Sequence, residues 1–168
     1  MPVPEFAPVT AAAPAAEIGA LSALATAIVR EHYDPIIGRE QNDYMLEKFQ
    51  SPAALREQMA AGYRYYRVER DGRAAGFLAF LPREGKMYLS KLYLARDCRG
   101  EGLGRAMVDF VARRARREKL AAVFLNVNRH NAAAIAFYRH LGFHRLREEK
   151  NPIGNGFFMD DLVLELPL

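Results

Sequence analysis

The chain has a single cysteine, Cys98, among its 168 residues. No intrachain disulfide can form, and a zinc site with several cysteine ligands is excluded. No histidine neighbours Cys98 in the sequence, so we expect a packing or loop role for this thiol rather than a nucleophilic one. The N-terminal residues 1–16 lack the pattern of a signal peptide, and no stretch approaches the ~20 apolar residues of a membrane span. These absences predict a cytoplasmic protein without a membrane partner.

Positively charged residues are only modestly in excess over negatively charged ones. Lysine and arginine number 24 against 20 aspartates and glutamates, a difference of +4. Such an excess favours an anionic ligand, either a nucleotide cofactor or a nucleic acid. The predicted helix 103–119 carries five basic residues near its end, but its apolar stripe leaves them on a solvated face, so we expect no nucleic-acid partner. His140 and His144 are separated by Gly142, which ends a predicted helix, so we expect no metal.

Hydrophobic periodicity and turn residues divide the chain into an ordered series of elements. Residues 1–16 form a loose arm with an edge strand near 6–10. Helices follow at 15–33, 39–49 and from Pro52 to Gly62, with Asp34-Pro35 expected to break the first one. Three strands at 63–70, 74–81 and 87–94 come next, then helix 103–119, strand 121–127, a helix from Asn131 to His140, and strands 143–149 and 157–166, with residues 151–156 as a loop.

This order predicts an α/β protein with a mixed sheet. A meander of strands is antiparallel, whereas strands joined by crossover helices are parallel. We therefore expect a central sheet, part antiparallel and part parallel, flanked by helices. The sequence shows no internal repeat and no linker, so we predict one domain over residues 1–168.

A glycine-rich turn between a strand and an amphipathic helix is the strongest local motif. It reads Arg99-Gly100-Glu101-Gly102-Leu103-Gly104-Arg105. Glycines at alternate positions let successive backbone N–H groups point into one concavity, and the helix adds its unsatisfied N–H groups and dipole. The turn lacks the Gly-Lys-Ser/Thr sequence that ends a P-loop. It also lacks a third glycine three residues after the second, which a dinucleotide-binding fingerprint requires. It predicts a cradle for a diphosphate.

The same turn, Arg99-x-x-Gly102-x-Gly104, resembles the pyrophosphate-binding signature of the GNAT superfamily of N-acetyltransferases. A second block, from Asn126 through Asn131 and Tyr138 to Phe143, resembles the family's other cofactor-contacting segment. The resemblance implies a GNAT-like acyl-CoA N-acyltransferase fold, with a cofactor-binding core at 87–143 and variable substrate-side helices at 17–62. It also implies an enzyme that transfers an acetyl group from acetyl-CoA, as co-substrate, to a primary amine.

The resemblance assigns roles to individual residues. Tyr138 would be the catalytic acid that protonates the departing sulfur, and a backbone N–H near Leu92 would polarise the carbonyl where the strands of Leu89 and Ala122 splay. Asn131 caps its helix and would also contact the cofactor. The expected cofactor-binding residues are Leu92, Tyr93, Leu94, Arg99, Gly100, Glu101, Gly102, Leu103, Gly104, Arg105 and Asn131.

Attack of an amine on a thioester also requires a proton acceptor, because a lysine-like amine with a pKa near ~10.4 is mostly protonated at neutral pH. The sequence leaves this acceptor open among Tyr44, Glu47, Tyr93, Asp160, Asp161 and a water molecule. Asp160 and Asp161 are adjacent in a strand and point to opposite faces, so at most one of them faces the site.

Two other functions remain open at this level: a non-catalytic regulatory module that binds acyl-CoA, and an acyltransferase with a different acyl donor. The acceptor could be a small amine, polyamine, antibiotic, peptide N-terminus or protein lysine. A homodimer is possible.

Overall fold

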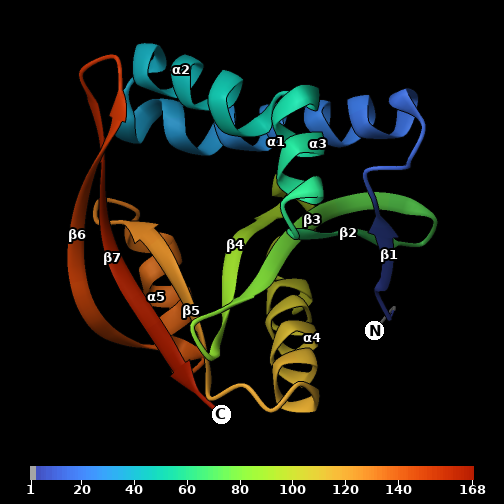
Figure 1. Cartoon of the computed structure of the whole chain (residues 1–168), viewed down its shortest axis with the longest axis vertical. Helices are drawn as coiled ribbons and strands as arrows, with labels where there is room; N and C mark the ends of the chain where they lie inside the picture. The colour runs from blue at the N-terminus through green and yellow to red at the C-terminus, as the bar shows by residue number, and fades with distance from the viewer. Residues whose placement is uncertain (1–2) are drawn as a thin grey trace. The chain divides into compact units, whose positions relative to one another are not determined.

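The computed structural model describes residues 3–168, and the first two residues of the predicted N-terminal arm lie outside this range. The chain divides into two compact units. The first extends to Leu81 and includes Lys91–Val108, and the second comprises Pro82–Ser90 and Asp109–Leu168. Hydrogen bonds join the strands into a seven-stranded sheet in the order β1-β2-β3-β4-β5-β7-β6 (Figure 1). The prediction of one domain over 1–168 stays a prediction.

The observed elements follow the predicted order closely. The helices are α1 (Ala15–Ile37), α2 (Arg39–Gln50), α3 (Pro52–Ala60), the short 3₁₀ helix η1 (Arg96–Cys98), α4 (Leu103–Arg117) and α5 (Ala132–His140). The strands are β1 (Glu5–Val9), β2 (Arg64–Arg70), β3 (Arg73–Arg83), β4 (Lys86–Leu94), β5 (Ala122–Asn128), β6 (His144–Gly154) and β7 (Phe157–Pro167).

The sheet is mixed, as predicted. β1 with β2, and β2 with β3, are antiparallel, and so are β5 with β7 and β6 with β7. β4 and β5 are parallel and pair through Met87 with Val123 and Tyr88 with Phe124. Their shared ladder thus lies near the amino ends of both strands.

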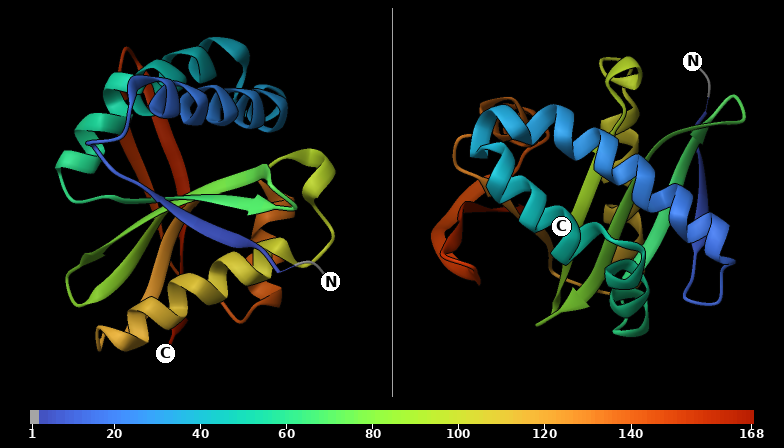
Figure 2. Two further views of the ribbon diagram at one scale, coloured as in Figure 1. Left: turned by 90° about the vertical axis from the view of Figure 1, so that its right-hand side faces the viewer. Right: turned by 90° about the horizontal axis from the view of Figure 1, so that it is seen from above.

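In the first unit, helices α1, α2 and α3 lie on one side of β1, β2 and β3 (Figure 2). The apolar stripe of α1 and part of α3 pack against inward-facing strand residues in one core cluster. Its members include Ile18, Leu21, Ala25, Leu55, Met59, Tyr65 and Phe77. In β2 the buried residues are Tyr65 and Val68, which are three positions apart and therefore point to opposite faces of the strand.

Local capping chemistry determines several of the element boundaries. The backbone N–H of Ala54 donates to Ser51 Oγ at 3.2 Å, and Pro52 occupies the first helical position, so α3 begins as predicted. Asp71 and Gly72 both have positive φ, 53° and 74°, in the two-residue turn between β2 and β3. That backbone is typical of a type I′ hairpin turn.

The prediction that Asp34-Pro35 ends the first helix is wrong. α1 continues to Ile37 with Pro35 inside it. Pro35 lies in the last turn of the helix, where its missing N–H removes only one backbone hydrogen bond. Two hydrogen bonds to the neighbouring Asp34 also hold this turn in place. The Asp34 backbone oxygen accepts from the Gly38 N–H at 3.0 Å, and its carboxylate accepts from Asn42 Nδ2 at 2.7 Å. Gly38, at φ 86°, ends the helix instead.

The predicted loop at 151–156 is also largely wrong, because β6 continues through Asn151-Pro152 to Gly154. β6 is the terminal strand in the sheet order, so a proline that cannot donate is tolerated there. The register shifts between Pro152 and Gly154, which absorbs the irregularity as a bulge. Only Asn155 and Gly156, at φ 54° and 78°, form the turn into β7.

Substitution of Gly76 in β3 would test how closely the backbones of β3 and β4 approach each other. A Cβ atom at this position would lie 2.0 Å from the backbone oxygen of Tyr93, which is rigid backbone rather than a flexible side chain. We expect Gly76→Ala to lower the free energy of unfolding by about 1–3 kcal/mol, the usual cost of overpacking. Chemical denaturation would measure it.

The matched control is Gly19→Ala in α1, where an added Cβ meets nothing within 4 Å. Because glycine is a poor helix former, this change should stabilise the protein by about 0.5–1 kcal/mol. Equal effects of the two substitutions would contradict the close approach of β3 and β4.

Candidate active site

The carboxyl end of β4 is held by two sets of hydrogen bonds. The Ala95 N–H donates to the Ala75 oxygen at 2.8 Å, which continues the pairing with β3 for one more residue. The Arg99 guanidinium then reaches back, and its Nε and Nη2 donate to the Leu94 oxygen at 3.2 and 3.0 Å. Five residues after Leu94, the chain is thereby tied to the end of the strand. The glycine turn therefore starts from a defined position.

Two of the three glycines of the turn have the unusual backbone that their spacing predicts, and Gly104 does not. Gly100 and Gly102 have φ of 80° and 81°, in the left-handed region that other residues rarely adopt. α4 begins at Leu103, and the Ala106 N–H donates to the Gly102 oxygen at 3.1 Å. Helix geometry leaves the preceding N–H groups, through Arg105, without partners inside the helix. This is the arrangement that binds anions at helix N-termini.

The side chains of the turn are engaged within the protein, so a ligand would meet mainly its backbone. Gly104 is helical and buried, so it provides room for packing rather than unusual backbone geometry. The Glu101 carboxylate forms an ion pair with Arg70. Leu103 packs with Ala75 in a small core cluster, so only its backbone N–H is available to a ligand.

Cys98 belongs to the same small cluster. Burial raises the pKa of its thiol, and the charge of Asp97 raises it further. The side chain therefore stays a neutral thiol near neutral pH, which agrees with the expected packing role.

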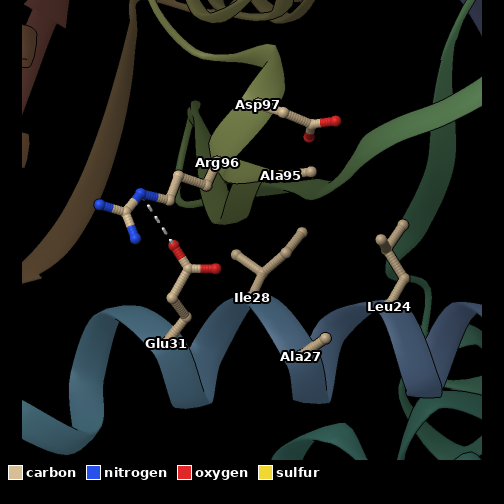
Figure 3. Close-up of a pocket in the computed structure, with 7 residues that line it drawn as sticks. All are labelled: Leu24, Ala27, Ile28, Glu31, Ala95, Arg96 and Asp97. Atoms are coloured by element: carbon tan, nitrogen blue, oxygen red, sulfur yellow. Dashed lines mark ion pairs between the residues drawn. The ribbon is translucent and has the colours of Figure 1, made fainter.

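A pocket of about 510 Å³ opens between α1 and the residues that lead into the turn (Figure 3). Its lining residues are Leu24, Ala27, Ile28 and Glu31 of α1, with Ala95, Arg96 and Asp97. An ion pair joins Arg96 Nε to a Glu31 carboxylate oxygen at 3.7 Å on one side, while the α1 side chains supply an apolar floor. An apolar pocket next to an anion-binding turn suits a ligand with an apolar arm attached to a phosphate.

In the second unit, Asn131 caps α5 as predicted. It is 2% exposed, and its side chain accepts a hydrogen bond from the Ala134 N–H at 3.3 Å. Its own N–H donates to the Asn128 oxygen at 2.9 Å, which closes the turn between β5 and α5. The capping role is therefore confirmed, and a cofactor contact stays a prediction.

Tyr138 lies on α5 and is 8% exposed. Its ring makes edge contacts with the rings of Phe137 and Phe143, at centroid distances of 5.2 and 5.3 Å. These contacts limit how the ring can rotate, so its hydroxyl has a defined direction. Leu92, Tyr93, Leu94 and the turn belong to the first unit, and Asn131 and Tyr138 to the second.

The two adjacent aspartates of β7 have different surroundings. The Asp160 carboxylate forms an ion pair with Arg129 at 2.8 Å, whereas Asp161 is 3% exposed. Burial raises the pKa of Asp161 to about 6, and the negative charges of Asp160 and Glu149 add to this effect. Asn126 Nδ2 opposes it, donating to Glu149 at 3.1 Å and to Asp161 at 3.5 Å. Asp161 is therefore a buried carboxyl group whose pKa approaches neutrality.

The other proposed proton acceptors lie in the first unit. The Tyr93 ring packs at 5.2 Å from Phe77 against the core cluster of that unit. Tyr44 is half-buried on α2, with Lys48 Nζ 5.6 Å from its ring centroid, and Glu47 is exposed on the same helix. None of these surroundings favours proton transfer over an ordinary structural role.

Lys91 of β4 is a buried polar residue to which the sequence pattern assigns no role, and it is 6% exposed. Burial lowers the pKa of its ammonium to about 7. A signal is present in the sequence, because Lys91 alternates with Leu89 and Tyr93 on the inward face of a strand, where a lysine is costly.

Neither a membrane span nor a metal cluster is found in the part of the chain that the structure describes. Within residues 3–168, no helix is long and apolar enough to cross a membrane. In the same residues, no group of three or more histidine, cysteine, aspartate or glutamate side chains is arranged to hold a metal ion.

Comparison with known proteins gives concordant results. Residues 26–143 match the family model described as the Acetyltransferase (GNAT) family. Over 111 residues, 64% of this chain and 74% of the relative, the sequence is 29% identical to the [Ribosomal protein bS18]-alanine N-acetyltransferase of Escherichia coli K12.

Two solved structures are similar in fold. The PaiA N-acetyltransferase of Thermoplasma acidophilum, in complex with coenzyme A, superposes with a TM-score of 0.80 at 16% identity and 99% coverage of both chains. The ribosomal-protein-alanine N-acetyltransferase of Brucella melitensis gives a TM-score of 0.66 at 22% identity, again with 99% coverage of both chains.

Proposed function

Since this chain belongs to the acetyltransferase (GNAT) family, we propose that it acetylates the α-amine at the N-terminus of a protein or peptide. The protein is an acetyl-CoA-dependent N-acetyltransferase, and the proposal concerns its acceptor. The similarity to an alanine N-acetyltransferase over 111 residues is the observation that carries it. The chemistry supports it too, because an α-amine has a pKa of about 7.7–8.0 against about 10.4 for lysine and gives up its proton more readily.

We assign the binding of acetyl-CoA to the end of β4 and the glycine turn. The N–H groups from Gly102 to Arg105 and the positive end of α4 would receive the diphosphate. Residues 92–94 would offer backbone hydrogen bonds to the pantetheine arm. The Arg99 guanidinium, which holds the Leu94 oxygen at 3.0 Å, keeps the end of this strand in place.

Acetyl-CoA supplies an activated thioester, so no covalent enzyme intermediate is needed. In the proposed reaction the amine nitrogen bonds to the acetyl carbon, the carbon–sulfur bond breaks, and a proton leaves the nitrogen. Tyr138 donates a proton to the departing sulfur. The Leu92 N–H stabilises the carbonyl oxygen, and the β4–β5 ladder, which pairs Met87–Val123 and Tyr88–Phe124, leaves this N–H outside it.

For the amine proton we favour Asp161. Its pKa of about 6 lies near the working pH, whereas the carboxylate of Asp160 is engaged in an ion pair with Arg129. General bases work best when their pKa lies near the operating pH. The same negative charge would attract a cationic amine before proton transfer.

The remaining expectations form part of the same proposal. We place the acceptor on the side of helices α1 to α3, and the reaction in the cytoplasm. The basic residues of α4 serve solubility rather than nucleic-acid binding, and homodimer formation stays open.

The acceptor can be identified by release of the coenzyme A thiol. Peptides that begin with alanine should be turned over, whereas the same peptides with a blocked N-terminus and a free internal lysine should not. Mass spectrometry of the product would locate the acetyl group. Turnover of the blocked peptide at the same rate would point to lysine acetylation and overturn the assignment.

Replacing Tyr138 with phenylalanine separates an enzyme from an acyl-CoA sensor. Loss of a general acid should lower kcat by about 10²–10⁴-fold. The affinity for acetyl-CoA, measured by calorimetry, should stay within about twofold, because the ring and its packing are kept. Tyr88→Phe in β4 is the matched control and should leave kcat unchanged. A Tyr138→Phe protein with full activity would rule out this tyrosine as the acid.

Gly100→Ala tests the turn. Gly100 and Gly85 have the same φ of 80°, and an added Cβ meets nothing within 4 Å at either position. Both substitutions should therefore lower the free energy of unfolding alike, by about 1–2 kcal/mol. Only Gly100→Ala should also weaken acetyl-CoA binding, by about tenfold, because its positive φ helps to set the turn that presents the proposed N–H donors from Gly102 to Arg105. Equal affinities of the two variants would separate the turn from the cofactor.

A further inference from the structure

The glycine turn contains an acidic side chain where an anionic ligand is expected. Glu101 lies between Gly100 and Gly102, directly before the backbone N–H groups that we assign to the diphosphate. Its side chain is 50% exposed. A carboxylate and a diphosphate repel each other, so an unpaired Glu101 would oppose binding of the ligand by its own turn. A negative side chain at this place therefore needs a counter-charge.

Arg70 of β2 supplies this counter-charge. It is the last residue of the strand and pairs with Arg73 in the ladder between β2 and β3, so the hairpin fixes its backbone. Its Nη1 forms an ion pair with the Glu101 carboxylate, and its Nη2 lies 3.9 Å from Cys98 Sγ. The side chain is 19% exposed. The guanidinium is thus held between the end of β2 and the start of the turn.

The turn has other attachments that hold its backbone in place. Cys98 and Leu103, on either side of it, pack together with Ala75 in the small core cluster. The Arg99 guanidinium is bonded to the Leu94 oxygen at 3.2 and 3.0 Å. An ion pair with a half-exposed partner adds little to stability, because both groups are also well solvated when apart. The main effect of the pair is therefore on the charge of the turn.

We infer that Arg70 is a positioning residue for acetyl-CoA: its guanidinium binds the Glu101 carboxylate, directs it towards the end of β2 and offsets its charge, so that the turn can receive a diphosphate. This inference rests on the proposed function, which assigns the diphosphate to the N–H groups from Gly102 to Arg105. Arg70 acts through Glu101 rather than through contact with the ligand.

Three variants separate the two charges. Arg70→Met leaves Glu101 without its partner, Glu101→Gln removes the negative charge at nearly constant shape, and the double variant removes both charges. Arg67→Met is the matched control. It removes an ion-paired arginine from the same strand, but the partners of Arg67 are Glu17 and Glu69, which lie outside the turn.

Calorimetry with acetyl-CoA at low salt measures the effect. Arg70→Met should weaken binding by about tenfold, because Glu101 then repels the diphosphate. Glu101→Gln and the double variant should both stay within about threefold of the wild type, and Arg67→Met within about twofold. A double variant as weak as Arg70→Met would show that the arginine holds the turn mechanically, and would overturn the inference. So would wild-type affinity in Arg70→Met.

Salt and a second ligand test the electrostatic origin of this loss. The ratio of the Kd of Arg70→Met to that of the wild type should fall from about ten at about 0.01 M salt to about two or less at about 1 M, where the Debye length is only about 3 Å. A ratio that does not depend on salt would contradict charge repulsion.

The ligand 3′-dephospho-CoA keeps the diphosphate but lacks the phosphate on the ribose. The loss of affinity in Arg70→Met at low salt should be equally large with this ligand. A loss confined to ligands that carry the ribose phosphate would place the repulsion there instead, and would overturn the inference.

The outcome can be told apart from a failure of the proposed function. If Gly100→Ala weakens acetyl-CoA binding and Arg70→Met does not, the turn still binds the cofactor and only the role of Arg70 is overturned. If neither variant weakens binding, the assignment of the turn and the inference both fall. Rejection of peptides that begin with alanine would overturn the proposed acceptor alone, because the calorimetric result does not depend on turnover.

Discussion

The hydrogen bonds from the Arg99 guanidinium to the last carbonyl of β4 constrain the path of the chain beyond that strand. They tie residue 99 to residue 94, at 3.0 and 3.2 Å, while the intervening residues form η1. The glycine turn begins at this fixed point, and α4 starts directly after it. The direction of α4, and hence of its free N–H groups, is therefore determined by the end of a strand. Anion binding by backbone groups depends on such rigidity, since N–H groups cannot adjust as side chains can.

The proposed donor side consists mainly of backbone groups, and the sequence predicts the conformation of this backbone well. Gly100 and Gly102 are required by a backbone conformation, whatever surrounds them. The proposed acceptor side depends on side chains that meet only in the folded protein. Asp161 and Glu149 share the amide of Asn126 across three strands, at 3.5 and 3.1 Å, and no local spacing indicates that contact. The GNAT match accordingly helps more with the cofactor than with the acceptor.

Local chemistry can be predicted well wherever it decides the outcome alone. Ser51 and Asn131 cap their helices because a short polar side chain at this position can accept a hydrogen bond from a free backbone N–H of the first turn. Asp71-Gly72 forms its turn because both residues tolerate positive φ. In these cases the residue type and its nearest neighbours contain the whole argument.

The wrong predictions share a different cause. Pro35 and Pro152 suggest breaks in the sequence, yet each lies where the missing N–H costs little: one in the last turn of a helix, the other in the terminal strand of the sheet. Alternation places Lys91 on the inward face of its strand but does not indicate its partners, because the three oxygens that accept from its Nζ come from α2 and α3. The Asn126 contacts are of the same kind. Tertiary context, rather than local propensity, decides each of these positions.

The long outer strand β6 has a consequence for how the protein behaves in a crowded solution. β6 stands at the end of the strand order, with all but two of its residues exposed. An eleven-residue edge could recruit strands from other molecules and seed aggregates. Instead it combines arginine, glutamate and lysine in residues 145–150 and then has Pro152. Charged side chains of both signs, and a proline that has no N–H to donate, make this edge a poor template for another strand. The edge can therefore be long without promoting aggregation.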